Sequence, residues 1–300
     1  MRIGVIYGGV STEREVSINT GRQIINNLDK NKYEVVEIEI IEKKDIFKVV
    51  DLNLDFAYIA LHGEFGESGD VQAVLETAGI KYSGSGILSS AVCMDKDVTK
   101  VLVKNAGVRV IDGICVRKED NTKFSELNLG EKVILKPNRG GSSIGIYFAT
   151  NQEELEYGLS EIFKLGEEEV VIEEMKSGVE ISVPIISGKV YPTLLIEPLK
   201  DTFFDYTSKY ENGGAKEYVH FFEDELQKEI NDFTEKAYKA VKCKGFARID
   251  YIIVDNKAYF LEVNTLPGMT QNSLLPKSTL HMGYSYSETL DLLIQESMKQ

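Results

Sequence analysis

Cysteine is scarce in this chain of 300 residues, which contains only three: Cys93, Cys115 and Cys243. They form no CxxC pair, and their odd number leaves one thiol unpaired under any disulfide pairing. This usage indicates a reducing compartment. The first residues, MRIGVIYGG, show no basic flank, long apolar run or small-residue cleavage site, so neither export nor a membrane span is expected. The sequence therefore predicts a cytoplasmic protein.

Basic residues are also few relative to acidic ones: the chain has 34 Lys and Arg against 48 Asp and Glu, and its formal net charge is -14. A field of this sign repels polyanions, so nucleic acid and anionic membranes are not expected partners. A local basic pocket for a small phosphate ligand remains compatible with this negative net charge.

The chain has no internal repeat, low-complexity tract or Pro- or Ser-rich linker, so its domains should pack together. Its length fits two or three domains of roughly 100 residues. Apolar runs and their periodicity predict an α/β domain with a parallel sheet over 1–92, followed by α+β units over 93–178 and 179–300.

The expected elements are bounded by glycine breaks and turn residues, such as Asp255-Asn256 between the last two strands. Expected strands cover 2–7, 35–41, 55–61, 110–116, 132–136, 144–148, 169–174, 180–186, 190–196, 245–254 and 257–263, and expected helices cover 12–28, 70–78, 95–105, 153–165 and 224–242.

Polar residues follow several of the expected strands, at the edge where open α/β sheets present ligands. After the first strand, Thr12 and Glu15 have the spacing of a capping box, and helix capping is the favoured interpretation of segment 9–15 taken alone. His62 opens a glycine-containing loop over 62–69, for which a tight connection and a structural histidine are the plain interpretation.

A glycine-rich loop over 136–145 joins two expected strands. Its backbone N–H groups and hydroxyls would surround a phosphate, with the Lys136 ammonium beside it. An ordinary hairpin with Lys136 in solvent is an equal alternative. The chain contains no GxxxxGK[ST] motif, and Gly84-Ser85-Gly86 matches only half of a dinucleotide fingerprint, so we interpret the latter as a loop.

A fourth patch lies on the last expected hairpin. Arg248 and Asp250 share one face of one strand, and Glu262 and Asn264 share one face of its partner. Burying two carboxylates, an amide and a guanidinium together is costly without a ligand. Their oxygens suit Mg²⁺, which also binds nucleotide phosphates. The alternative is a surface salt-bridge ladder, which the apolar neighbours on both strands disfavour.

Seven segments, in order along essentially the whole chain, resemble signatures of the D-alanine–D-alanine ligases of the ATP-grasp superfamily. They are GGVSTEREVS, LHGEFGESG, MDK, KPNRGGSSIG, FFDYTSKY, GFARIDY and LEVNTLPGMTQNSL. The resemblance implies a three-domain ATP-grasp ligase, with a parallel-sheet α/β domain over 1–92 and two α+β ATP-grasp domains over 93–178 and 179–300. The stretch 200–216 would be its lid. One departure is Ser68, where relatives usually carry Asp.

The implied activity is ATP-dependent ligation of two D-alanine molecules to D-alanyl-D-alanine through a D-alanyl phosphate, for peptidoglycan precursor synthesis. Two Mg²⁺ (or Mn²⁺) ions and a homodimeric assembly are implied as well. Because an acyl phosphate hydrolyses easily, a closing lid that excludes water is a physical requirement of this chemistry.

The resemblance also assigns roles position by position. Glu13 would pair with the ammonium of the first D-alanine, Arg248 would stabilise the carboxyl phosphate, and Ser142 and Tyr210 would form a latch with Glu13. The implied substrate-binding residues are His62, Gly268, Ser273 and Leu274. The implied ATP-binding residues are Lys96, Lys136, Ser143, Glu173, Glu174, Met175, Lys176, Glu180 and Lys209, and the implied metal ligands are Asp250, Glu262 and Asn264.

Two alternatives stay open. Another ATP-grasp ligase, for D-lactate or other amino acids, would share the ATP residues, although Tyr210 argues against lactate. A catalytically inactive nucleotide-binding protein would show no release of ADP in response to D-alanine.

Overall fold

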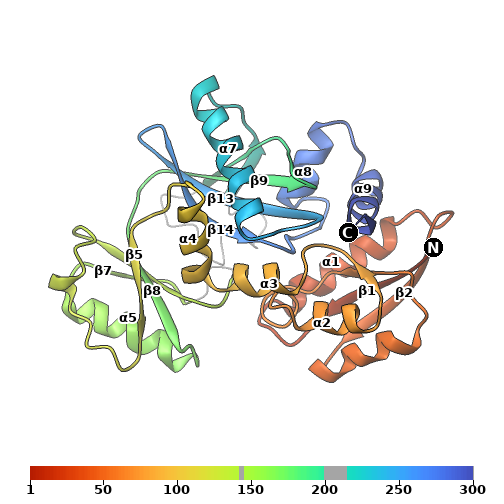
Figure 1. Ribbon diagram of the computed structural model, residues 1–300, viewed down its shortest axis with the longest axis horizontal. Coiled ribbons are helices and arrows are strands. Elements are labelled where there is room, and N and C mark those ends of the chain that lie inside the picture. Colours follow the sequence, from red (N-terminus) through yellow and green to blue (C-terminus); the bar gives the residue numbers. More distant parts are fainter. Residues whose placement is uncertain (142–144, 199–214, 300) are drawn as a thin grey trace.

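The computed structural model describes residues 1–141, 145–198 and 215–299, which form three β-sheets joined by helices (Figure 1). The sheets come from residues 2–82, 113–174 and 179–264. The first is parallel and the other two are antiparallel, which confirms the predicted mixture of α/β and α+β architecture. The domain boundaries at 92 and 178 stay a prediction. None of the described helices combines the length and apolar character that a membrane crossing needs.

The first sheet has the strand order β2-β1-β3-β4. Its central strand β1 is buried from Ile3 onward, because both faces of the sheet are covered. Helices α1 and α9 cover one face, and α2 with the 3-10 helix η1 covers the other. The bounds are β1 Arg2–Gly8, β2 Glu34–Ile40, β3 Phe56–Ile59, β4 Lys81–Tyr82, α1 Arg14–Asn27, η1 Lys43–Asp51, α2 Asp70–Thr77 and α9 Tyr286–Met298.

The second sheet has the order β5-β8-β6-β7, and helix α5 packs on it through Leu155 and Ile162. Helices α3 and α4 connect the first sheet to the second (Figure 1). The expected strand 110–116 begins only at Gly113, because Val110 instead bridges to Phe260 outside this sheet. The bounds are α3 Ile87–Met94, α4 Lys96–Asn105, β5 Gly113–Arg117, η2 Phe124–Glu126, β6 Val133–Pro137, β7 Tyr147–Ala149, α5 Gln152–Lys164 and β8 Glu169–Glu174.

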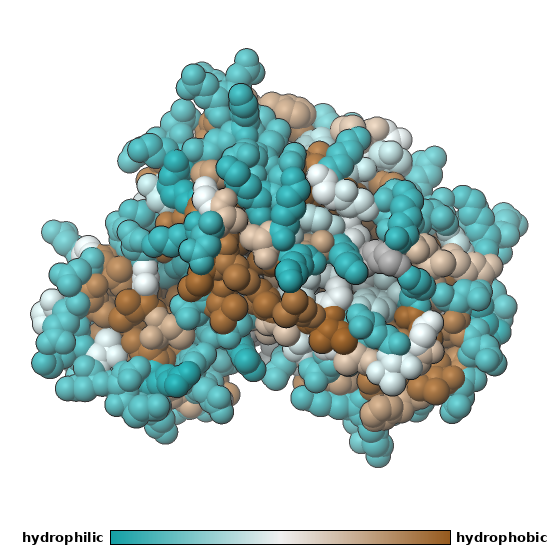
Figure 2. All heavy atoms as spheres, viewed as in Figure 1, coloured by the Kyte–Doolittle hydropathy of each residue, from teal (hydrophilic) through white to brown (hydrophobic). Residues whose placement is uncertain are grey.

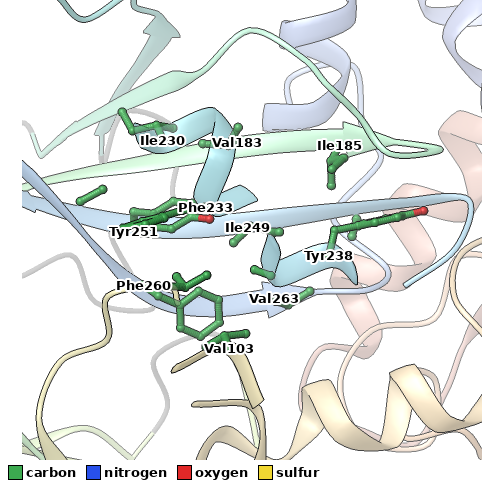
Figure 3. Packing of buried hydrophobic residues seen from close by; sticks show 14 of the residues in the cluster. Val103, Val183, Ile185, Ile230, Phe233, Tyr238, Ile249, Tyr251, Phe260 and Val263 are labelled. Atoms are coloured by element: carbon green, nitrogen blue, oxygen red, sulfur yellow. The ribbon is translucent and has the colours of Figure 1, made fainter. Parts of the chain in front are cut away.

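The third sheet has the order β12-β11-β9-β13-β14, with β10 paired to β9. Helix α7 packs Ile230, Phe233 and Tyr238 on this sheet, and Val103 of α4 joins the same buried cluster near Phe260 (Figure 3). The bounds are β9 Val179–Ile186, β10 Lys189–Val190, β11 Leu194–Pro198, β12 Ala215–Val219, α7 Asp224–Ala240, β13 Phe246–Val254 and β14 Lys257–Asn264.

A turn and a proline decide how the strands of the third sheet are divided. Asp255 and Asn256 both have positive φ, at 48° and 57°, so the predicted hairpin turn is confirmed. The expected strand 190–196 is wrong, because it is split into β10 and β11. Pro192 lies between them and lacks the N–H group that a sheet ladder requires.

Among the described residues, the sequence did not predict the α-helices α3, α8 (Leu274–His281) and α9, nor the 3-10 helices η1 and η2. Helix α8 packs beside β9 and β12 of the third sheet, and α9 returns the chain to the first sheet, near which both chain ends lie (Figure 1). Leu290 and Leu293 of α9 share a buried cluster with Ile3 and Val5 of β1. Helix α9 therefore completes the hydrophobic core of the first sheet.

Candidate active site

A cleft of about 760 Å³ takes its walls from all three sheet-containing parts of the molecule. It collects residues that are far apart in the sequence, and carboxylates outnumber basic groups among them. The predicted site residues on its walls are Glu13, His62, Lys96, Glu180, Arg248, Asp250, Glu262, Asn264, Gly268, Ser273 and Leu274.

Glu13 enters the cleft from the start of α1, where it is the N-cap residue and only 8% exposed. No side chain caps this helix, so the capping interpretation of Thr12 and Glu15 is wrong. The hydroxyl of Ser11 accepts from the backbone N–H of Glu13 at 3.2 Å and donates to the carbonyl of His62 at 2.7 Å. Segment 9–15 therefore binds the His62 loop and presents Glu13 to the cleft.

His62 lies on the same wall, 7% exposed. Its Nε2 is 3.1 Å from the hydroxyl of Thr20, and its Nδ1 is 3.7 Å from Oε1 of Glu67. Burial raises the pKa of Glu67, although His62 and the N–H group of Gly63 favour its charged form. Glu67 was not predicted as a site residue. The sequence feature that could have identified Glu67 as a site residue is its position in the glycine-containing loop 62–69.

Lys96 is the first residue of α4, whose N-cap Asp95 accepts from the N–H group of Val98. The Lys96 ammonium donates to the carbonyl of Gly140 at 2.6 Å, which ties α4 to the glycine-rich loop. Burial lowers the pKa of Lys96. A basic side chain thus stands beside the loop that the sequence suggested for phosphate binding.

Lys136 and Glu173 do not line the cleft directly. The Glu173 carboxylate is held between Lys100 at 2.5 Å and Lys136 at 2.7 Å. Burial would raise the pKa of Glu173, but the two ammonium groups outweigh it and lower the pKa to about 2. Burial lowers the pKa of Lys136, but the carboxylates of Glu173, Glu262 and Glu180 reverse this and raise it. Lys100 was not predicted, because only the tertiary fold brings this residue of α4 next to Glu173 at the end of β8.

The segment 173–176, predicted as the adenine hinge, leaves the end of β8. The N–H group of Glu174 donates to the carbonyl of Asp112, and that of Met175 donates to the carbonyl of Lys132. The Lys176 ammonium lies 2.6 Å from the Glu174 carboxylate. These contacts fix the course of the segment, and its role towards adenine stays a prediction.

The predicted cluster on the β13–β14 hairpin is assembled as expected. Arg248 lies opposite Asn264 and Asp250 lies opposite Glu262 in the ladder. Asp250 accepts from Arg248 at 3.0 and 2.8 Å, from Asn264 at 3.0 Å and from the hydroxyl of Ser182 at 2.6 Å. The Asp250 carboxylate is thus oriented by side chains from three strands.

The acceptor end of the predicted site lies where α8 begins. Ser273 is the N-cap residue, and its hydroxyl accepts from the N–H group of Thr270 at 3.1 Å. A Cβ atom at Gly268 would lie 3.2 Å from the Ser273 hydroxyl, so Gly268 allows the loop to approach the helix start closely. Ser273, Leu274 and Gly268 all face the cleft.

Four predicted residues, Ser142, Ser143, Lys209 and Tyr210, lie outside the described residues. The same holds for the predicted lid, except that residues 215 and 216 begin strand β12.

Comparison with known proteins covers the whole chain. Residues 2–52 match the family model described as D-ala D-ala ligase N-terminus, and residues 102–295 match D-ala D-ala ligase C-terminus. A D-alanine–D-alanine ligase of Clostridium beijerinckii is 48% identical over 301 residues, which cover 100% of this chain and 99% of that protein.

Solved structures give the same result. The D-alanine–D-alanine ligase of Bacillus anthracis complexed with ATP has a TM-score of 0.90 at 43% identity, covering 100% of this chain and 98% of that one. The VanG D-Ala:D-Ser ligase of Enterococcus faecalis has a TM-score of 0.82 at 31% identity, covering 99% of each chain. With the cleft described above, these similarities show that the chain belongs to the D-alanine–D-alanine ligase family.

Proposed function

We propose that this chain joins two D-alanine molecules to D-alanyl-D-alanine and converts ATP to ADP and phosphate. The observation that carries the proposal is that one cleft contains a carboxylate at Glu13, a basic group at Lys96 and the cluster around Asp250. Such a cleft offers an ammonium site and a phosphate site next to each other. Full-length similarity to ligases named for D-alanine supports this choice of substrate.

In the first half-reaction, the carboxylate of one D-alanine attacks the γ-phosphorus of ATP, and ADP leaves. Glu13 would hold the donor ammonium, and His62 would lie near its carboxylate. Arg248 would stabilise the charge that develops on the carboxyl phosphate, since its guanidinium opens into the cleft beside Asp250.

ATP would lie between the second and third sheets. Lys96 and Lys136 would contact its phosphates, the segment 173–176 would bind adenine, and Glu180 would bind the ribose. The position of Glu180 on the cleft wall and the contact of Lys96 with the glycine-rich loop support this placement. Ser143 and Lys209 would add further contacts. ATP is named as the bound ligand of the Bacillus anthracis structure.

Asp250, Glu262 and Asn264 would hold two Mg²⁺ (or Mn²⁺) ions. The donor set fits, because carboxylate and amide oxygens are the ligands such hard cations prefer. Among the described residues, no group of three or more His, Cys, Asp or Glu side chains is arranged to hold a metal. Phosphate oxygens of ATP would therefore have to complete the coordination. When bound, the ions would neutralise phosphate charge and orient the γ-phosphoryl group.

In the second half-reaction, the amine of another D-alanine attacks the acyl phosphate, and phosphate leaves. Ser273 and Leu274 would receive the acceptor carboxylate, with Gly268 beside them. The stretch 200–216 would close over the site, latched by Ser142 and Tyr210 with Glu13. Pro198 and Ala215 are paired across β11 and β12, and Ala215 lines the cleft, which supports a lid at this position.

A homodimer is proposed as well. An apolar band runs over α3 and α4 in the centre of one face (Figure 2). It includes Ile87, Leu88, Val98 and Val101, each at least 38% exposed. Burying such a band against a second copy removes apolar surface from water. Light scattering should give twice the chain mass, and Leu88→Glu should shift the protein towards monomer. A monomeric wild type would contradict this assembly.

We also propose that the enzyme acts in the cytoplasm and supplies peptidoglycan precursors. The three cysteines are free, which agrees with a reducing compartment.

The experiment that tests the proposed function supplies ATP, Mg²⁺ and a panel of D- and L-amino acids and D-lactate. We expect ADP release only when D-alanine is present, with D-alanyl-D-alanine as the main product. Equal ADP release without an amino acid, or a main product that contains D-lactate or D-serine, would overturn the proposal.

A further inference from the structure

The cleft contains an ion pair that none of the roles above uses. Nζ of Lys277 donates to Oε2 of Glu217 at 2.6 Å, and the side chains are 30% and 20% exposed. Both residues line the cleft. Lys277 belongs to α8 and Glu217 to β12, so the pair connects two elements across the cleft wall.

Lys277 lies on the same face of α8 as the proposed acceptor residues. It follows Ser273 by four residues and Leu274 by three, and residues at these spacings are neighbours on a helix surface. All three residues face the same cleft. The Lys277 ammonium therefore faces the space into which the acceptor carboxylate would enter.

The charge of the cleft makes this ammonium important. The carboxylates of its described walls belong to Glu13, Glu15, Glu67, Glu180, Glu217, Asp250 and Glu262, and its Lys and Arg side chains are Lys96, Lys277 and Arg248. Lys96 binds the carbonyl of Gly140, and Arg248 binds Asp250. An acceptor with a negative carboxylate would be repelled by this surplus of acidic groups unless a basic group stood at its end of the cleft.

We propose that Lys277 is a specificity-determining residue that selects acceptors with a free α-carboxylate. We also propose that the Glu217 carboxylate partly neutralises the Lys277 ammonium. The inference rests on the proposed function, and it adds the feature by which the acceptor is recognised. Lys277 contributes a point charge to the carboxylate, beyond any hydrogen bonds from Ser273 and Leu274. Glu217 competes with the incoming carboxylate for the same ammonium, which limits the affinity for anions.

The alternative is that the Lys277–Glu217 pair has only a structural role, in which it fastens α8 to β12. Partly exposed ion pairs often contribute little to stability. A fastening role and a recognition role differ in one respect: loss of a fastener affects all acceptors alike, whereas loss of a recognition charge affects only acceptors that carry a carboxylate.

The test is a competition between D-alanine and D-alaninamide as acceptors, supplied together at fixed pH with ATP and Mg²⁺. Mass spectrometry gives the ratio of D-alanyl-D-alanine to D-alanyl-D-alaninamide. Each variant is its own internal standard, because both products arise from the same acyl phosphate. Donor activation is measured separately as D-alanine hydroxamate formed with hydroxylamine.

In Lys277→Met we expect the dipeptide-to-amide ratio to fall about tenfold, which corresponds to about 1.4 kcal/mol. Lys277→Arg should keep most of the wild-type ratio, and Glu217→Gln should raise it. Hydroxamate formation should stay near the wild-type rate in all three variants. Lys32→Met is the matched control, since it removes another pair between distant elements, Lys32 with Asp291 at 3.0 Å, and should leave the ratio unchanged.

An unchanged ratio in Lys277→Met, with hydroxamate still formed, would overturn the inference and leave the proposed function intact. The role given to Glu217 would be overturned if Glu217→Gln lowered the ratio as Lys277→Met does, because removal of a competing carboxylate should strengthen recognition by Lys277. Absence of hydroxamate in the wild type would instead count against the proposed function.

Discussion

At the scale of single residues, Glu173 controls the charge next to the proposed phosphate site. It is 4% exposed and lies between the ammonium groups of Lys100 and Lys136. Its pKa is lowered from 4.5 to about 2. Because the folded-state pKa is the lower one, the carboxylate stabilises the fold fully above pH 4.5. That contribution is lost as the pH falls towards 2.

Glu173→Gln should therefore reduce the free energy of unfolding at pH 7 by about 3 kcal/mol, since it leaves two ammonium groups without their carboxylate. Between pH 4.5 and 2, the stability of the variant should fall less steeply than that of the wild type. Urea unfolding at a series of pH values measures both effects. Glu235→Gln, which removes a surface pair with Lys239, is the control and should change neither. Identical pH slopes for wild type and Glu173→Gln would contradict the assignment.

Glu262 and Asn264 lead to a different expectation, because they face the cleft and not the core. Glu262→Gln and Asn264→Ala should each lower turnover about a hundredfold or more by removing a metal ligand. Their melting temperatures should stay near that of the wild type. ADP release and thermal unfolding are the two measurements. Full activity with an unchanged melting temperature would show that the metal ions bind elsewhere.

The residues of the candidate site differ in how far the sequence could predict them. Asp250, Glu262 and Asn264 follow from alternation on two adjacent strands, which places their side chains without knowledge of the tertiary fold. Lys100, Lys277 and Glu217 could not be predicted. Each acts through a partner on an element far away in the sequence, and only the packing of the helices on the sheets brings the partners together.

At the scale of elements, helix α9 acts as part of the first sheet's core. Leu293 is fully buried in the cluster that contains Ile3 and Val5. Leu293→Ala should lower the free energy of unfolding by about 2–5 kcal/mol, through lost burial and the cavity left behind. Leu280→Ala, at a position that is 63% exposed, is the matched control and should cost far less. Equal losses for both variants in urea unfolding would show that α9 does not support this core.

The elements that sequence patterns predicted well are the buried strands. Strand β8 has the expected bounds, and β1, β13 and β14 differ from them by a single residue at one end. Apolar runs ended by glycines or turn residues mark such strands. Helix α3 was missed because its sequence, ILSSAVCM, is short and apolar along much of its length. Helix α8 packs beside β9 and β12, and α9 packs against the first sheet, and no local pattern reveals such long-range contacts.

At the scale of the whole molecule, the three sheets place the two proposed half-reactions around one space. Glu13 and His62 come from the first part, Lys96 and the glycine-rich loop from the second, and the Asp250 cluster from the third. Helix α8, which carries the acceptor end, packs beside β9 and β12 of the third sheet, and its Leu275 belongs to the buried cluster that also contains Ile3 and Val5 of the first sheet. The donor and acceptor ends are therefore held by a shared core, which favours a fixed spacing between the two amino acids.

We propose that this cleft activates one D-alanine as an acyl phosphate before the second one attacks. This proposal is tested most directly by supplying D-alanine labelled with ¹⁸O in both carboxylate oxygens and analysing the released phosphate by mass spectrometry. The donor oxygen that bonds to phosphorus leaves with the phosphate, so we expect one ¹⁸O atom in each phosphate and one phosphate per dipeptide. Phosphate without the label, released together with the dipeptide, would contradict it.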